Sequence, residues 1–142
     1  MAESEHPYCR CLFYAANALA RTITRLAEEA FAPTGLAPSP AFVLMTVHRQ
    51  PGVQPSEIAA IMMLSPSTVT RLVEKLEAKG LLRRESCGKA THIELTEAGQ
   101  ALGPVLQEAW AATQARTAGL LGEKACALTE HVYAAARVLE GG

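Results

Sequence analysis

The sequence predicts a mainly α-helical fold with one small β-hairpin. Apolar residues recur at helical spacing through most of the 142 residues, and alanine-rich stretches lie towards both ends. Near the centre, two short helical segments are separated only by Met63-Leu64-Ser65. Two segments that read as β-strands, residues 81–85 and 91–95, follow the second of them. A chain of this length is one domain by the usual prior, so we predict a single domain over residues 1–142.

The segment SPSTVTRLVEKLEAKGLL, residues 65–82, forms the centre of this fold. Ser65 is expected to cap a helix, Pro66 suits its first turn, and Gly80 stands where the helix ends. Apolar residues recur at i, i+3, i+4 and i+7, which places them on one face. They are Val69, Leu72, Val73 and Leu76. The opposite face carries Ser67, Arg71 and Glu74, flanked by Thr68, Thr70 and Lys75.

The neighbouring segments make this helix part of a larger motif. Gln54-Pro55-Ser56-Glu57 reads as the start of an upstream helix, and two helices joined by so tight a turn form a helix-turn-helix. Downstream, Ser86, Cys87, Gly88 and Lys89 are expected at the tip between the two strands, which form a hairpin wing. The predicted fold is therefore a winged helix-turn-helix over about residues 41–96, flanked by further helices.

The polar face of the central helix suits the major groove of DNA. Short hydroxyls near a helix N-terminus reach base edges or phosphates, and cations one or two turns later meet phosphates and guanine. Arg71 is the first candidate for a base or phosphate contact, and Lys75 for a phosphate contact. Residues 71–89 hold six Lys and Arg against three Glu, although the whole chain has a net charge of −1. The candidate DNA-contacting residues are Ser65, Ser67, Thr68, Thr70, Arg71, Lys75, Arg83, Arg84 and Lys89.

Residues 55–99 also carry a family resemblance. PSEIAAIMMLSPSTVTRLVEKLEAKGLLRRE followed by IELTEAG resembles the winged helix-turn-helix core of MarR-type transcriptional regulators. The resemblance implies a homodimeric bacterial protein that binds a pseudo-palindromic operator, usually a repressor released by a small ligand or by thiol oxidation. MarR-type wings commonly carry an Asp-Arg pair whose arginine enters the minor groove. Here Lys89 is the only cation at the tip; lysine is the poorer minor-groove probe because it is more strongly hydrated, whereas phosphate binding is unaffected.

The helices outside the core are expected to make the homodimer. Leu12, Leu19 and Leu26 stand seven residues apart in a helix predicted over about residues 8–32, and such a seam suits packing against another long helix. After a loop rich in proline and glycine, Ala41–His48 is expected to form a short apolar helix.

Residues 97–140 are predicted to form the second dimerisation region. Thr96 is expected to cap a long helix, which Pro104 should kink because proline removes a backbone donor. A break at Gly119 to Gly122 precedes a last amphipathic helix. The apolar faces at the two ends are wider than one small domain can bury, so these helices are expected to pack together or against a second copy.

Four cysteines raise the question of sensing. Cys9 and Cys11 flank Arg10 near the predicted N-terminus of the first long helix, a place that favours thiolates. A hydroperoxide-sensing subset of the MarR family carries a reactive cysteine there, and Cys126 is the candidate for a second cysteine from the partner subunit. Cys87 on the wing is a third candidate. The alternatives are small apolar core residues, or a metal-responsive site of His6, Cys9 and Cys11 that lacks a fourth ligand.

Other functions are weaker alternatives or are excluded. A small aromatic ligand is a further inducer candidate, with Tyr14, Arg25 and Phe42 as lining residues. A winged-helix module that binds proteins without specific DNA binding is the alternative function. No Cys-His-acid signature and no C-x-x-C motif is present, so we do not expect an enzyme. We also expect no bound metal, since a fourth ligand is missing, and no cofactor. We expect a cytoplasmic protein without a membrane partner, because no apolar run approaches the roughly 20 residues of a span.

Overall fold

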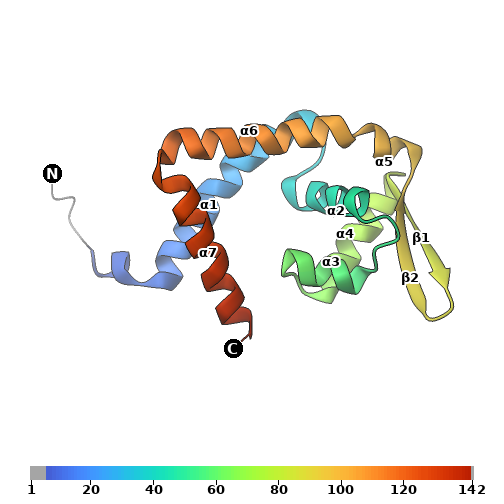
Figure 1. Cartoon of the computed structure of the whole chain (residues 1–142), viewed down its shortest axis with the longest axis horizontal. Coiled ribbons are helices and arrows are strands. Elements are labelled where there is room, and N and C mark those ends of the chain that lie inside the picture. The colour runs from blue at the N-terminus through green and yellow to red at the C-terminus, as the bar shows by residue number, and fades with distance from the viewer. Residues whose placement is uncertain (1–5, 142) are drawn as a thin grey trace. The chain divides into compact units, whose positions relative to one another are not determined.

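The structure, a computed structural model that describes residues 6–141, confirms the mainly helical fold with one hairpin (Figure 1). Its described elements are the 3-10 helices η1 (Pro7–Arg10) and η2 (Ala32–Thr34), the helices α1 (Leu12–Phe31), α2 (Pro38–Arg49), α3 (Pro55–Met62), α4 (Pro66–Ala78), α5 (Glu97–Ala101), α6 (Gly103–Leu121) and α7 (Lys124–Gly141), and the strands β1 (Leu82–Cys87) and β2 (Ala90–Leu95). The chain divides into two compact units: Ala30–Trp110, called the winged unit below, and a helical unit made of both chain ends.

Local hydrogen bonds explain why α3 and α4 begin where the sequence predicts. Glu57 accepts the backbone N–H of Gln54 at 3.1 Å, as in a capping box, and Pro55 occupies the first helical position. Ser65 caps α4 by accepting the N–H of Thr68 at 3.3 Å. Between the two helices, Met63 takes a left-handed conformation with φ of 53°, which makes the turn tight. The predicted helix-turn-helix is confirmed.

One apolar core holds the winged unit together. The apolar face of α4 packs into this core: Val69, Val73 and Leu76 are at most 1% exposed, and Leu72 is half-buried. They pack with residues from α2, α3, the hairpin and the start of α6, among them Leu44, Ile58, Leu82, Ile93 and Leu106. Because α4 contributes to the centre of this core, its polar face is left on the surface of a rigid body.

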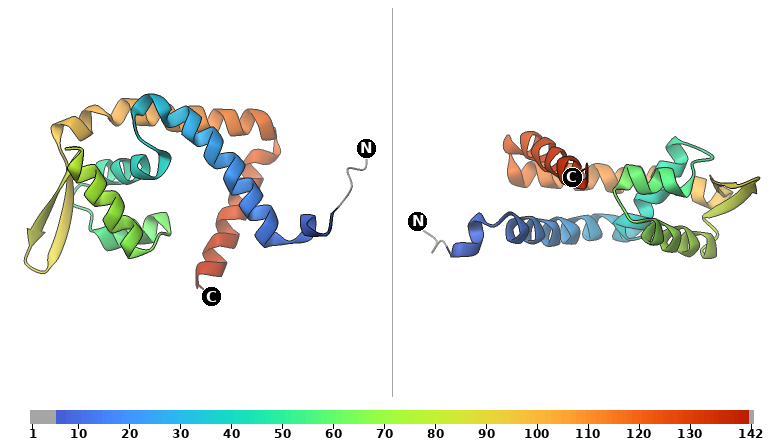
Figure 2. Two further views of the ribbon diagram at one scale, coloured as in Figure 1. Left: turned by 180° about the vertical axis from the view of Figure 1, so that it is seen from behind. Right: turned by 90° about the horizontal axis from the view of Figure 1, so that it is seen from below.

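The hairpin is longer, and its tip shorter, than expected. The antiparallel register pairs Leu82 with Leu95 and continues to Cys87 with Ala90, which leaves a two-residue turn of Gly88 and Lys89. The predicted four-residue tip was wrong because Gly88 takes a φ of 65°, a left-handed conformation that suits such a turn and lets pairing extend to its edge. The predicted wing itself is confirmed, and Figure 2 shows the hairpin projecting beyond α3 and α4.

Proline positions correct two predicted helices. The long helix expected after Thr96 is two helices, because α5 ends at Ala101 and Pro104 lies in the first turn of α6, where the missing N–H is tolerated. Pro104 therefore accompanies a helix start rather than a kink. Likewise α2 starts at Pro38 instead of Ala41, since a proline at the first helical position is compatible with a helix.

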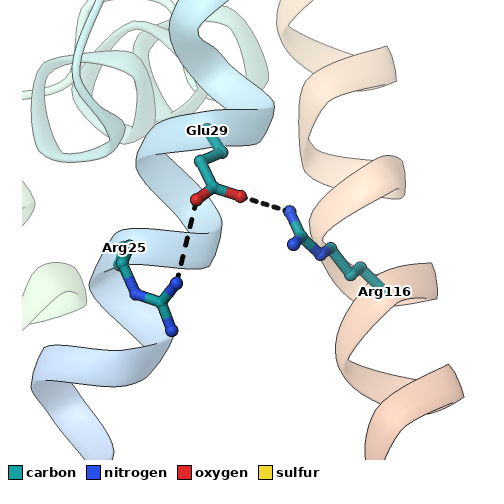
Figure 3. Close-up of polar contacts among 3 residues, drawn as sticks. All are labelled: Arg25, Glu29 and Arg116. Carbon is teal, nitrogen blue, oxygen red and sulfur yellow. Dashed lines mark hydrogen bonds and ion pairs between the residues drawn. The ribbon is translucent and has the colours of Figure 1, made fainter.

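The helical unit contains most of α1, the C-terminal part of α6, and α7. The helix expected from about Tyr8 instead begins at Leu12, after the separate turn η1. Figure 3 shows Glu29 of α1 between two arginines: Arg116 of α6 at 2.5 Å and Arg25, one turn earlier, at 4.0 Å. The predicted break before the last helix is confirmed at Gly122, where φ is 67°.

Many large apolar side chains of the helical unit are exposed. They include Tyr8, Leu12, Phe13, Leu120, Tyr133, Val138 and Leu139. Leu12, at the start of the predicted seam, is 66% exposed, whereas Leu26 is buried. In the described part of the chain no single helix is long and apolar enough to cross a membrane, and one bent pair, Leu12–Thr34 with Pro38–Arg49, passes by length and composition only.

Candidate DNA-binding interface

The exposed face of α4 carries the cations that the sequence predicts. Arg71 and Lys75 are exposed, on the side opposite the buried Val69 and Val73. Within residues 6–141, neither cation makes a hydrogen bond or an ion pair, and Glu74 on the same face does not bind Arg71. Both cations are therefore available to an external anion.

The hydroxyls at the N-terminus of α4 have local partners. Ser65 Oγ lies 2.8 Å from Thr68 Oγ1 and 3.2 Å from Ser67 Oγ, so its first role is the cap. Thr70 donates to the carbonyl of Pro66 at 3.0 Å. Ser67 and Thr70 are exposed, whereas Thr68 is half-buried. The structure thus gathers all four at one helix end, with Ser67 and Thr70 the more accessible to a ligand.

The three predicted wing cations differ in their surroundings. Arg83 binds Glu85 of the same strand at 3.0 Å, and both side chains are more than half exposed. Arg84 binds Glu77 of α4 at 2.8 Å. Lys89 lies in the two-residue turn at the tip, exposed and without an internal partner in the described region. Lys89 is therefore the wing cation most open to DNA.

The ion pair of Glu77 and Arg84 shifts the pKa of both groups. The side-chain hydrogen bond from Arg84, and then the bond from its backbone N–H, lower the pKa of Glu77 below its ordinary value. The same side-chain bond raises the pKa of Arg84. The sequence predicts Arg84 as a DNA contact, whereas in the structure its partner is Glu77 of α4, seven residues upstream.

Comparison with known proteins identifies this arrangement. Residues 34–90 match the family model described as MarR family. In this segment the chain is similar to the MarR family. MarR-family transcription regulators are not enzymes. No curated protein is significantly similar in sequence.

Solved MarR-like structures share the fold over nearly the whole chain. The M. tuberculosis transcriptional regulator MosR has 23% identity and a TM-score of 0.83, covering 95% of this chain and 99% of MosR; it has also been solved in complex with DNA. CouR from Rhodococcus jostii RHA1, bound to p-coumaroyl-CoA, has 21% identity and a TM-score of 0.76, covering 96% of each chain. AbsC from Streptomyces coelicolor has 23% identity and a TM-score of 0.79, covering 97% of this chain and 98% of AbsC.

A pocket in the winged unit offers space for a small molecule. Its volume is about 340 Å³, within the range of ordinary ligand sites. The lining residues are Phe42, Met45, Thr46, Arg49, Ile61, Met62 and Trp110. The Arg49 guanidinium lies 5.4 Å from the centroid of the Trp110 ring. Of the predicted ligand-lining residues only Phe42 is here, because Tyr14 and Arg25 belong to the helical unit.

All four cysteines are exposed in the single chain, so none of them lies in its core. Cys9 lies in η1 and Cys11 follows it, where its carbonyl accepts the first hydrogen bond of α1 from Ala15 at 2.9 Å. Cys126 lies on α7, and its thiol is 3.8 Å from a Glu130 carboxylate oxygen.

The structure gives no support to the alternative of a metal site at His6, Cys9 and Cys11. In the part of the chain that the structure describes, no three His, Cys, Asp or Glu side chains are placed to hold a metal ion. His6 instead accepts the N–H of Tyr8 at 3.2 Å and so caps η1.

Proposed function

We propose that this protein is a MarR-family repressor that binds a pseudo-palindromic DNA operator as a homodimer. The observation that carries the proposal is the polar face of α4, where Arg71 and Lys75 are exposed and unpaired on a helix whose other face is locked in the core. A helix held in this way can enter a major groove and keep its side chains in register with bases and phosphates. The MosR complex with DNA, and the CouR repressor on a 23-mer duplex, support this use of the shared fold.

The helical unit supports the homodimer. Its exposed apolar residues, such as Leu12, Phe13 and Leu139, are each more than 60% exposed in a single chain. Covering them with the same surface of a second copy would bury apolar area that otherwise faces water. The two copies of α4, called the recognition helices because we propose that they enter the major groove, would then lie about 34 Å apart, one turn of DNA. Sedimentation at micromolar concentration should give a dimer; a monomer that still binds DNA tightly would contradict this.

Substitution of Arg71 tests DNA binding directly. Arg71→Ala should weaken specific binding to the DNA upstream of the protein's own coding sequence by on the order of 1–3 kcal/mol, since it deletes a charged groove contact. Arg137→Ala, on the exposed surface of α7, removes the same charge and should leave binding almost unchanged. If the two variants bound alike, the recognition-helix assignment would be wrong.

The pocket supports release by a small ligand. Aromatic and aliphatic walls favour a flat apolar body, and the guanidinium of Arg49 favours a carboxylate on it. Ile61 and Met62 line the pocket just before the helix-turn-helix turn, so an occupant would contact the element that positions α4. We infer that an aromatic carboxylate is the class of ligand that fits best.

Thiol oxidation is the second route of release. Exposure of Cys9 and Cys11 supports reaction with an oxidant, and the exposed Cys126 supports capture of the product by a partner subunit. Operator affinity should fall in the parent after treatment with an organic hydroperoxide and stay constant in the Cys9→Ser/Cys11→Ser double variant. Equal losses in both proteins would exclude this pair as the sensor.

A further inference from the structure

The connection between the recognition helix and the wing is held by one carboxylate. Glu77, in the last turn of α4, accepts the Arg84 guanidinium with one oxygen at 2.8 Å and the Arg84 backbone N–H with the other at 3.2 Å. Both oxygens are therefore bonded to a single residue of β1. A carboxylate with two bonds to one residue fixes direction as well as distance.

A threonine holds the same connection from the other side. The Thr96 hydroxyl donates to the Gly80 carbonyl at 2.6 Å and accepts the N–H of Gly99 at 3.1 Å. The Thr96 N–H donates to the carbonyl of Leu81, also at 3.1 Å. Gly80 and Leu81 are the two residues between Lys79, the C-cap of α4, and Leu82, which starts β1. Both of their carbonyls are thus fixed to the cap of α5.

We propose that Glu77 is a positioning residue for DNA binding: with Thr96 it sets the angle between α4 and the wing, so that Arg71 and Lys89 reach one duplex together. This inference rests on the proposed function. Under this proposal Arg84 binds Glu77 and does not contact DNA. The wing contact that depends on the angle between α4 and the wing is the tip cation Lys89.

The length of the hairpin makes the angle important. β1 has six residues. At about 3.3 Å per residue the tip lies roughly 20 Å from the base, so a tilt of about 10° moves Lys89 by about 3 Å. A contact with a phosphate does not survive such a displacement. The bonds between Glu77 and Arg84 at the base of the hairpin, called the clamp below, therefore control a contact at the tip that they do not touch.

The other ion pair of the wing supplies a matched control. Arg83 and Glu85 lie on the same strand, so their bond at 3.0 Å joins no two elements. Glu77→Gln and Glu85→Gln remove the same charge, but only the first disturbs the clamp. A glutamine at 77 has one acceptor oxygen for two donors, since its amide nitrogen cannot accept a hydrogen bond. Arg84→Met opens the clamp from the other side with the opposite change of charge.

The experiment measures the affinity for one duplex, the DNA upstream of the protein's own coding sequence, between 50 and 200 mM salt. Lys89→Ala is made in the parent and in the Glu77→Gln, Arg84→Met and Glu85→Gln backgrounds. In the parent it should lower the salt slope by about one, which is about a threefold difference over this range. The Glu85→Gln background should show the same effect. In the Glu77→Gln and Arg84→Met backgrounds, Lys89→Ala should change the salt slope by less than half of its change in the parent. Arg71→Ala should weaken binding in these two backgrounds as much as it does in the parent.

The outcomes separate this inference from the proposed function. An undiminished effect of Lys89→Ala in both clamp variants would overturn the inference, and so would the lack of any effect of Lys89→Ala in the parent. A parent that shows no salt-dependent binding to the duplex would overturn the proposed function and the inference with it. Loss of the Lys89 effect in both clamp variants, despite their opposite charge changes, would exclude a general electrostatic cause and support the clamp.

Discussion

Replacing Gly99 with alanine tests the packing behind the wing. Gly99 is buried in α5, and a Cβ built on it would overlap the carbonyl oxygen of Leu81. The Leu81 carbonyl carbon would lie 3.0 Å away and its Cα 3.5 Å away. All three atoms are backbone, and the oxygen already accepts the N–H of Thr96 at 3.1 Å. Neither side can yield without breaking that bond or moving α5.

The expected loss of stability is the sum of opposing terms. Overpacking of this kind costs typically about 1–3 kcal/mol. A broken backbone hydrogen bond adds about 1 kcal/mol. Alanine is favoured over glycine inside a helix by up to about 1 kcal/mol, which offsets part of the loss. The net expectation is therefore about 1–3 kcal/mol, or a fall in Tm of roughly 3–10 °C.

Gly103 is the matched control for this substitution. It lies at the start of α6, its φ is not positive, and a Cβ there would have no heavy atom within 4 Å. Gly103→Ala should stabilise the fold by about 0.4–1 kcal/mol, chiefly by restricting the unfolded chain. The two variants thus make the same chemical change with opposite expected signs.

Urea unfolding measures both variants. Far-ultraviolet circular dichroism follows the helices, and the fluorescence of Trp110, the single tryptophan, follows the winged unit. All samples need one protein concentration, since association shifts the apparent stability. A Gly99→Ala protein as stable as the parent, or stabilised like Gly103→Ala, would refute the assigned packing of α5 against Leu81.

Two further predictions concern charge. The pKa of Glu77 is lowered from an ordinary value near 4.5 by its hydrogen bonds with Arg84, so its ionised form stabilises the folded state. The difference in unfolding free energy between the parent and Glu77→Gln should be largest above about pH 5 and should shrink as the pH falls through the lowered pKa of Glu77. A difference that does not change with pH in urea titrations would contradict this. Arg49→Ala should weaken binding of salicylate, used as a probe aromatic carboxylate, by about tenfold or more in calorimetry, since it removes a charge-assisted bond worth about 1.5–3 kcal/mol. Equal binding by parent and variant would place the ligand elsewhere.

The helix-turn-helix could be predicted because local rules determine it. Ser65 and Pro66 specify the start of α4, Gly80 specifies its end, and the spacing of Val69 and Val73 specifies which face is buried. Each of these features depends on residues within one or two turns, and the structure confirms all of them. The exposed positions of Arg71 and Lys75 follow from the same periodicity.

The remaining features depend on contacts that periodicity does not encode. The partner of Arg84 is decided by how the hairpin folds back on α4, and the pocket brings Arg49 together with Trp110, far apart in the chain. Pro104 was placed correctly in a helix but assigned the wrong effect, because proline suits a first turn as well as a kink. The wing tip was predicted too long because two strands can pair up to a turn that Gly88 alone makes possible.

The outer edge of β1 has a consequence for solubility. In the described structure β1 pairs only with β2, whereas β2 also forms a bridge with Val53. The outer edge of β1 therefore has no strand partner, although the Arg84 N–H on this strand is bonded to Glu77. Open strand edges of this kind template the addition of strands from other molecules. The run Arg83-Arg84-Glu85 lies on that strand and opposes parallel addition, because two identical strands paired in parallel and in register would place like charges side by side. We therefore expect the same charged run to oppose aggregation of concentrated, DNA-free protein through its wings.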